Sequence, residues 1–356
     1  MPPVVQRSLV AWLVGVALTL SACSAVGPQM VARDRFDYNG EVARSWKEQT
    51  LLNIVRARYL DMPVFLEVAQ IVSGYTLEST VSLGATDARS GARVAPGDNL
   101  TLGAQGRWTD RPTITYTPLT GAQFNRNMLT PIPPASVLFT MQAGWPIDLV
   151  FRVVVKSING ISSEGSSAER YERVVHLMRK LQQAEVLGMR LQGETSDKQS
   201  VVLFFRARAL TADQEELLGE LREALSLRPG QAEFRVSFGT VARQDGELVM
   251  LTRSMLQILI DLGAYVTVPD LDVQQGRTRA DRPQPESGSD SGILRIRSGS
   301  QRPADALVLV PYRGGWFWID DRDMASKRTF ALVMIFSTLS ETGGREGLPL
   351  VTIPAG

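Results

Sequence analysis

Three aspartates near the end of the chain are the strongest candidates for metal binding or acid–base catalysis. Asp320, Asp321 and Asp323 lie within four residues of one another, and hard divalent cations prefer carboxylate oxygens as ligands. The neighbouring basic residues are Arg322, Lys327 and Arg328. A helix is also expected to follow, and negative charge is stabilised at a helix N-terminus. We therefore favour ion pairing and helix capping over a metal or catalytic site.

The other residue types that enzymes use are scarce. The chain has one histidine, His176, and one cysteine, Cys23, so a multi-histidine or cysteine-based metal site is not expected. His176 lies in a helical pattern and is interpreted as a core or surface residue. No Gly-x-Ser-x-Gly elbow, Walker A loop or dinucleotide fingerprint is found. We predict no catalytic residue, no metal and no cofactor.

Two tryptophans alternate along a predicted strand. Trp316 and Trp318 are separated by one residue, and residues two apart on a strand share a face. Such a pair can stack on a ligand, or it can pack in a core or an interface. We favour packing for both tryptophans.

The N-terminal segment has the parts of a secretory signal in the required order. An apolar run of twelve residues, 9–20, is too short to span a bilayer as a helix. Leu20-Ser-Ala-Cys23 follows it and resembles the lipobox of bacterial lipoproteins. We therefore predict a signal peptide at 1–22, lipidation of Cys23 and membrane attachment through that anchor. Ser24 in place of aspartate favours, by resemblance to enterobacterial sorting, the periplasmic face of the outer membrane.

An alternating segment predicts a long hairpin. Apolar and polar residues alternate over 75–117, which predicts a β-meander with longer strands at 76–86 and 98–108 and a short strand at 111–117. Each longer strand has the length of about 9–11 residues that suits a tilted membrane-spanning strand. The candidate membrane-facing residues are Tyr75, Leu77, Val81, Leu83, Leu100, Leu102 and Trp108.

Two interpretations of this hairpin remain open. Membrane insertion would require several subunits, because open strand edges are not tolerated in lipid. A half-buried periplasmic sheet has the same alternation, and the sequence favours that interpretation.

The patterns predict a mixed α+β fold. Residues 23–40 are expected to be a tether, 41–160 an N-terminal domain with a helix and an antiparallel β-meander, and 161–356 a mixed α/β-type domain. A Gly/Ser patch at 159–167 marks the boundary, and the polar segment 274–291 is expected to be a flexible insertion.

Further elements follow from periodicity and from local signals. Thr211-Ala-Asp-Gln214 resembles a capping box that opens a helix, and the Gly314-Gly315 pair predicts a hairpin between the strands on either side of it. The segment 64–72 is either a strand or a short helix. Helices are expected at 41–61, 134–141, 147–155, 168–184, 211–227, 252–262 and 326–339, and strands at 201–206, 233–238, 293–297, 307–310 and 316–319.

Several blocks carry a family resemblance. They include Ser45-Trp-Lys-Glu-Gln-Thr-Leu-Leu-Asn53, Arg58-Tyr59, Gly144-Trp-Pro-Ile-Asp148, Thr252-Arg-Ser254 and Trp316-Phe-Trp-Ile-Asp-Asp-Arg-Asp323. Together they resemble one family of Gram-negative bacterial lipoproteins with no established activity. The resemblance implies an envelope location and carries over no catalytic residue.

Composition and charge narrow the choice of partner. The formal net charge is +1, so there is no basic surplus that would favour nucleic acid. We expect a non-enzymatic, outer-membrane-anchored lipoprotein that binds or scaffolds an envelope protein, or that forms a homo-oligomer. The alternative is an oligomeric pore or secretion-channel subunit that donates the 76–108 hairpin. A periplasmic hydrolase or metal-dependent enzyme is third.

Overall fold

The fold is α+β and comprises two compact units. The computed structural model describes residues 28–72, 75–86, 99–110, 113–192, 200–206, 210–242, 246–280 and 293–341. One unit contains residues 28–63 and 120–341, and the other contains 64–119. The predicted division at 159–167 is therefore wrong, because residues on both sides of this patch build one sheet in the larger unit.

The larger unit begins with a long helix, α2 (Pro28–Arg58). Pro28 is tolerated at the first helical position, where its missing N–H has no intrahelical partner. The described part of the predicted tether, residues 28–40, is therefore helical. The next proline, Pro63, lies beyond the end of this helix. The C-terminal half of α2 buries Leu51, Ile54 and Val55 completely and packs on α8 (Met255–Gly263) and β12 (Ala306–Tyr312).

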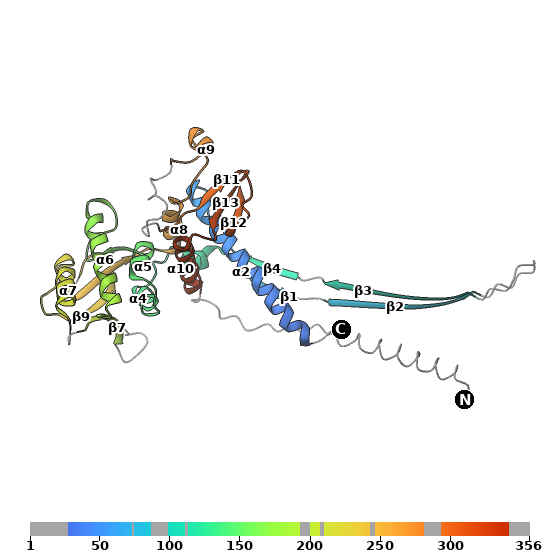
Figure 1. Ribbon diagram of the computed structural model, residues 1–356, viewed down its shortest axis with the longest axis horizontal. Coiled ribbons are helices and arrows are strands. Elements are labelled where there is room, and N and C mark those ends of the chain that lie inside the picture. Colours follow the sequence, from blue (N-terminus) through green and yellow to red (C-terminus); the bar gives the residue numbers. More distant parts are fainter. Residues whose placement is uncertain are drawn as a thin grey trace, which may run out of the picture. The chain divides into compact units, whose positions relative to one another are not determined.

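The larger unit contains a six-stranded sheet, whose strands β7 and β9 are labelled at the left of Figure 1. Its order is β6-β5-β10-β9-β8-β7, and β9 pairs with β10 in parallel while the other pairs are antiparallel. The strands are β5 (Val155–Ile158), β6 (Ile161–Ser162), β7 (Leu187–Gln192), β8 (Ser200–Phe205), β9 (Glu233–Phe238) and β10 (Glu247–Thr252).

The Gly/Ser patch is a hairpin turn and not a linker. Asn159 and Gly160 have φ values of 48° and 77°, as a two-residue hairpin turn requires. The Asn159 side chain also accepts a hydrogen bond from Val249 N at 2.9 Å and donates one to Leu225 O at 3.2 Å. These bonds fasten the turn to the sheet, which explains why composition alone misidentified it.

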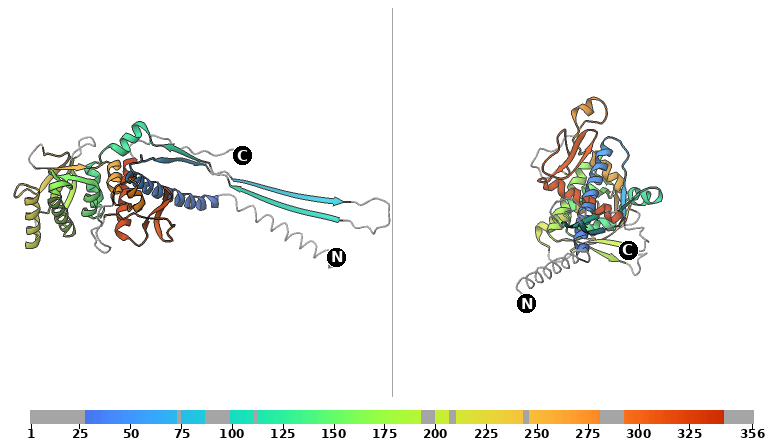
Figure 2. Two further views of the ribbon diagram at one scale, coloured as in Figure 1. Left: turned by 90° about the horizontal axis from the view of Figure 1, so that it is seen from above. Right: turned by 90° about the vertical axis from the view of Figure 1, so that its right-hand side faces the viewer.

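Helices accompany this sheet at positions close to the predicted ones. They are α4 (Pro134–Gln142), α5 (Ile147–Val154), α6 (Ala168–Gln183) and α7 (Ala212–Ala224). Helices α6 and α7 pack side by side (Figures 1 and 2). The predicted capping box of α7 is confirmed, because Thr211 and Gln214 exchange side-chain and backbone hydrogen bonds. Tyr171, Phe151 and Phe234 are among the largest fully buried side chains.

A second, three-stranded sheet has the order β11-β13-β12 and is antiparallel. It contains β11 (Arg297–Gly299), β12 and β13 (Gly315–Asp320). The predicted hairpin between β12 and β13 is confirmed, with positive φ at Arg313 and Gly314. The remaining elements are α3 (Gly121–Phe124), η2 (Asn125–Leu129), η3 (Gly165–Ser167), α9 (Asp270–Gln274) and α10 (Met324–Glu341).

The smaller unit, in its described part, contains four strands and no helix. They are β1 (Leu66–Val72), β2 (Tyr75–Thr86), β3 (Asn99–Asp110) and β4 (Thr113–Pro118). β2 pairs with β3 and β1 pairs with β4, both antiparallel. The segment 64–72, for which a strand and a short helix were both considered, therefore forms a strand from Leu66 to Val72. The predicted three-stranded meander is wrong, because β4 pairs with β1 instead of adding to β3.

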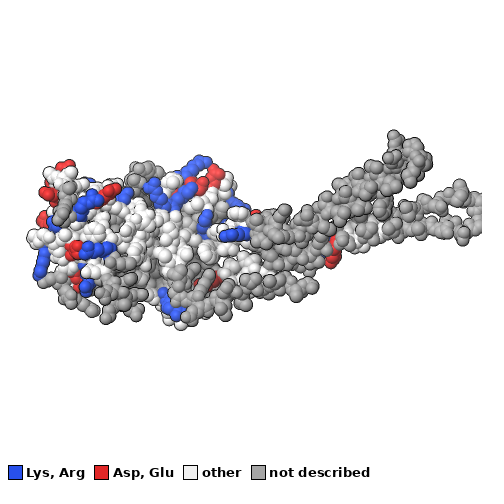
Figure 3. Space-filling view, turned by 90° about the horizontal axis from the view of Figure 1, so that it is seen from below, with Lys and Arg blue, Asp and Glu red and all other residues white. Residues whose placement is uncertain are grey.

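Acidic and basic side chains are interspersed on the face of the molecule shown in Figure 3, in keeping with the net charge of +1. None of the helices in the described ranges is long and apolar enough to cross a membrane.

Candidate functional sites

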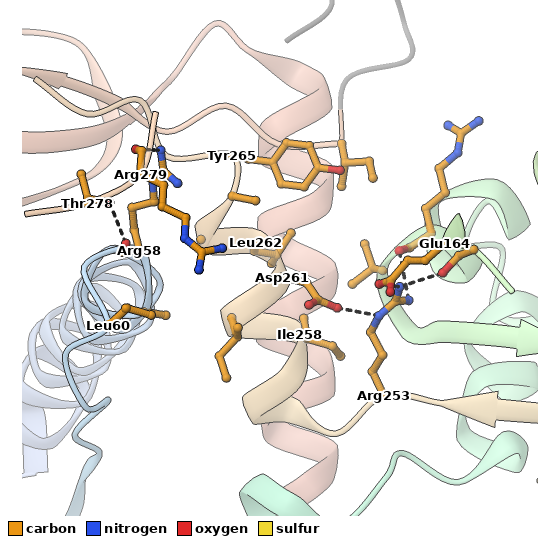
Figure 4. A pocket seen from close by; sticks show the side chains of 18 of the residues that line it. Arg58, Leu60, Glu164, Arg253, Ile258, Asp261, Leu262, Tyr265, Thr278 and Arg279 are labelled. Carbon is orange, nitrogen blue, oxygen red and sulfur yellow. Dashed lines mark hydrogen bonds and ion pairs between the residues drawn. The ribbon is translucent and has the colours of Figure 1, made fainter. Parts of the chain in front are cut away.

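A cavity of about 660 Å³ lies in the larger unit, between the end of α2, helix α8 and the segment after α9 (Figure 4). We call it the arginine cavity. Its basic lining residues are Arg58, Arg152, Arg253, Arg277 and Arg279, and its acidic ones are Glu164, Glu172 and Asp261. Basic groups thus outnumber carboxylates, and the cavity has the size of a small-molecule site, about 300–1,000 Å³.

Arg253 forms one wall of the cavity and is only 5% exposed. It directly follows β10 and precedes Ser254, whose side chain caps α8 by accepting a hydrogen bond from Gln257 N. Its guanidinium donates to Asp261 Oδ2 at 2.7 Å, to Val155 O at 2.8 Å and to Ser163 Oγ at 3.0 Å. The guanidinium is therefore fixed by α8, β5 and the loop before α6.

The carboxyl of Asp261 has a raised pKa despite this ion pair. Partial burial raises the pKa most, while Arg253 lowers it and Glu164 raises it further. Removal from water thus outweighs the attraction of Arg253. Beside this pair, the pKa of the Tyr171 hydroxyl is also raised, mainly by burial, and the hydroxyl lies 2.8 Å from the Val155 carbonyl oxygen that also accepts from Arg253.

The opposite wall carries Arg58 and Arg279 (Figure 4). Arg58 Nη2 donates to Arg279 O at 2.8 Å, and Thr278 Oγ1 donates to Arg58 O at 2.9 Å. These bonds fasten residues 278 and 279 to the end of α2. The predicted flexible insertion is therefore wrong for residues 274–280, because they form the end of α9 and this wall. Residues 281–291 lie outside the described residues.

The predicted aspartate group serves structure. Asp320 pairs with Arg297 at 3.1 Å, and Asp321 pairs with Lys327 at 2.7 Å. Asp323 accepts hydrogen bonds from Ser326 N at 3.1 Å and Ser326 Oγ at 2.7 Å, which caps α10. The favoured interpretation as ion pairs and a cap is confirmed. A search of the described residues found no group of three metal-ligating side chains.

The remaining predicted residues of the larger unit lie apart from the cavity lining. His176 is exposed on α6. Trp316 and Trp318 are half-buried on one face of β13, while Phe317 and Ile319 are buried on the other. The guanidinium carbon of Arg302 lies 5.5 Å from the ring centroid of Trp316, a cation–π distance. Trp316 thus packs with a side chain of the segment between β11 and β12.

The predicted hairpin forms a two-stranded ribbon of twelve residues per strand. The register on one face pairs Leu77 with Trp108, Val81 with Ala104, Leu83 with Leu102 and Ala85 with Leu100. The other face pairs Glu78 with Arg107, Thr80 with Gln105 and Ser82 with Gly103. Tyr75 pairs with Asp110, so Tyr75 and Trp108 lie at the same end of the ribbon, as predicted.

The arginine cavity was not predicted from the sequence. Arg253 and Asp261 are eight residues apart, but Arg58 and Arg279 are separated by 221 positions. The available signal was weak: an arginine between the end of a strand and Ser254, which opens a helix. Cys23 lies outside the described residues. Comparison of the chain with models of known protein families, with curated proteins and with solved structures found no match.

Proposed function

We propose that this chain is a lipid-anchored envelope protein whose 76–108 hairpin inserts into the outer membrane as part of an oligomer. The sequence favours a periplasmic scaffold over a pore or secretion-channel subunit. We prefer the second interpretation because of the length and the two faces of the ribbon. The supporting observation is a two-stranded sheet of twelve continuous register pairs, in which one face is mainly apolar, apart from Ser79, Gly106 and Asp110, and the other is polar.

The length of the ribbon supports insertion. Twelve residues at about 3.4 Å each span about 40 Å along the strand. With a tilt of about 40°, this length covers about 30 Å, the thickness of the hydrocarbon core. Tyr75 and Trp108, at one end, suit the interface between lipid and water.

The polar face supports contact with water. Glu78, Thr80, Ser82, Gln105 and Arg107 are all exposed. Its two charged residues, Glu78 and Arg107, are register partners near the aromatic end, so the middle of this face is uncharged. A polar, largely neutral face opposite an apolar one is typical of strands between lipid and a water-filled lumen.

The described part of the smaller unit contains no helix that could cover the ribbon. All six residues of β4 are exposed, including Ile114 and Tyr116. An isolated two-stranded hairpin is marginally stable in water, and its open edges are not tolerated in lipid. Both problems are solved if several subunits donate hairpins to one closed sheet.

Cysteine labelling in intact membranes tests the insertion. We would place single cysteines at Val81 and Leu102 on the apolar face and at Thr80 and Gln105 on the polar face. Gly103 is avoided because a Cβ there would lie 2.7 Å from Ser82 Oγ. We expect the first two to react only with a lipid-soluble thiol reagent and the last two with a water-soluble one. A cysteine at Glu216, exposed on α7, is the control for water access.

Protection of all four hairpin positions from both reagents would contradict insertion and favour a hairpin covered by a partner protein. A second measurement is the mass of the complex after mild detergent extraction. We expect a homo-oligomer, because one subunit supplies only two strands to the membrane; a monomer would contradict the proposal.

A further inference from the structure

We propose that the arginine cavity binds an amphiphilic anion, a carboxylate or phosphate group attached to a hydrocarbon chain. This inference rests on the larger unit alone and is independent of the proposed membrane insertion. It follows from the charge, the apolar lining and the size of the cavity.

Three of the arginines that line the cavity are paired with carboxylates. Arg253 pairs with Asp261, Arg152 with Glu172 at 2.8 Å, and Arg277 with Asp272 at 3.0 Å. In the described part of the chain, the guanidinium of Arg279 forms no hydrogen bond or ion pair with another residue, while its main-chain carbonyl accepts a hydrogen bond from Arg58. An arginine at a cavity wall without a carboxylate partner is a ready donor to an anionic group.

Several aliphatic side chains also line the cavity. Ile258, Leu262 and Ile293 line the cavity, together with Leu60 and Ile260. Leu60 is 89% exposed and Ile260 is 51% exposed, so large aliphatic side chains line its open side. A purely inorganic anion would leave these side chains in contact with water, whereas a hydrocarbon chain would cover them, and burial of apolar surface is favourable.

The charged and the aliphatic side chains lie in different parts of the cavity (Figure 4). Figure 4 shows Arg58 and Arg279 on one side, Arg253 with Asp261 on the other, and Leu262 and Ile258 between them. Because Arg253 already donates to Asp261, Val155 and Ser163, it serves as a fixed wall. Arg279 is then the residue expected to contact the anionic group, with the chain of the ligand lying over α8.

Calorimetric titration of the full chain in zwitterionic lipid nanodiscs tests this site. The probe is decyl phosphate below its critical micelle concentration, with empty nanodiscs as the reference. We expect saturable binding, and about tenfold weaker binding in Arg279→Gln, because one charge-assisted hydrogen bond is lost. Ile260→Ser should weaken binding of decyl phosphate without giving any gain for inorganic phosphate.

Arg173→Gln is the matched control, since Arg173 is an exposed arginine that pairs with Glu220 on the surface of α6 and α7. It removes the same charge and should leave binding unchanged. Equal weakening by both arginine variants would overturn the proposal, as would the absence of binding. Inorganic phosphate or decanol binding as tightly as decyl phosphate would also overturn it, because one half of the ligand would then be unnecessary.

The source of the ligand is separated by a second titration. Nanodiscs that contain phosphatidylglycerol offer an anionic lipid headgroup beside the protein. Competition with decyl phosphate that is lost in Arg279→Gln would identify a membrane lipid, and no competition would identify a free amphiphile. Either result supports the same binding chemistry.

Discussion

Arg253 and Asp272 are the two charged residues that are buried in the described part of the chain, and the first of them lies in the arginine cavity. Arg253 is bonded to three different segments. Removing one partner of a buried charge network costs about 3–5 kcal/mol. We expect Arg253→Met to lower the free energy of unfolding by about 3 kcal/mol in urea titration. Arg173→Met should cost about 1 kcal/mol or less, because its pair with Glu220 is exposed. Similar losses in both variants would contradict this role.

Asp261 should behave differently from its partner. The raised pKa of its carboxyl means that the folded protein disfavours the ionised form. This penalty is fully present at pH values above the folded pKa and is relieved as the pH falls towards 3.8, the ordinary value. Asp261→Asn should therefore lower the melting temperature at pH 7 by less than Arg253→Met does, because the amide oxygen can still accept from Arg253, and the difference from wild type should shrink in acid. Equal losses in the two variants at pH 7 would contradict this difference.

At the scale of elements, two glycines within helices differ in the space that surrounds them. A Cβ on Gly263, at the end of α8, would lie 3.2 Å from Arg58 N and 3.4 Å from Ile54 O, both backbone atoms of α2. A Cβ on Gly219, in α7, would meet nothing within 4 Å. Gly263 thus permits the close approach of α8 to α2 that shapes one side of the arginine cavity.

The two alanine substitutions should have opposite signs. Gly219→Ala should stabilise the protein by up to about 1 kcal/mol, because alanine is the better helix former. Gly263→Ala should destabilise it by about 1–3 kcal/mol, since the backbone of α2 must move. Thermal unfolding measures both. A stabilising Gly263→Ala would mean that the two helices separate at little cost.

The ribbon of the smaller unit is the element for which local and global requirements conflict. Its alternation satisfies strand pairing within the chain, but the described part of the unit provides no helix to cover it. This conflict is expected where a segment gains stability from a membrane or from other subunits. The hairpin is therefore an element whose stability depends on assembly.

At the scale of the whole molecule, lipidation of Cys23 is predicted to determine where the protein resides. Cys23→Ser should abolish incorporation of labelled palmitate and should leave an uncut precursor or a chain that is no longer anchored. Metabolic labelling and fractionation of the envelope measure this. Serine at the neighbouring Ala22 is a control that should leave the label in place. Native protein with an unmodified Cys23 thiol would contradict the anchor.

The sequence by itself determined those features that depend on neighbours within one or two turns of chain. The capping box at Thr211 and the cap at Asp323 were predictable, because each needs only residues a few positions apart. The Gly314-Gly315 pair also predicted the hairpin, although the two turn residues are Arg313 and Gly314. The alternation over 75–117 likewise predicted the paired strands and their two faces. The α+β class followed from the same periodicities.

Only the tertiary structure decided how distant segments meet. It paired β4 with β1, made the Asn159–Gly160 turn part of one sheet, and brought Arg58 against Arg279 across 221 positions. No local period encodes these partners, because strand pairing and helix packing depend on which surfaces are buried together. The arginine cavity exists for that reason: it is made by the close approach of α2 to α8, which a glycine at 263 permits and no pattern along the chain reveals.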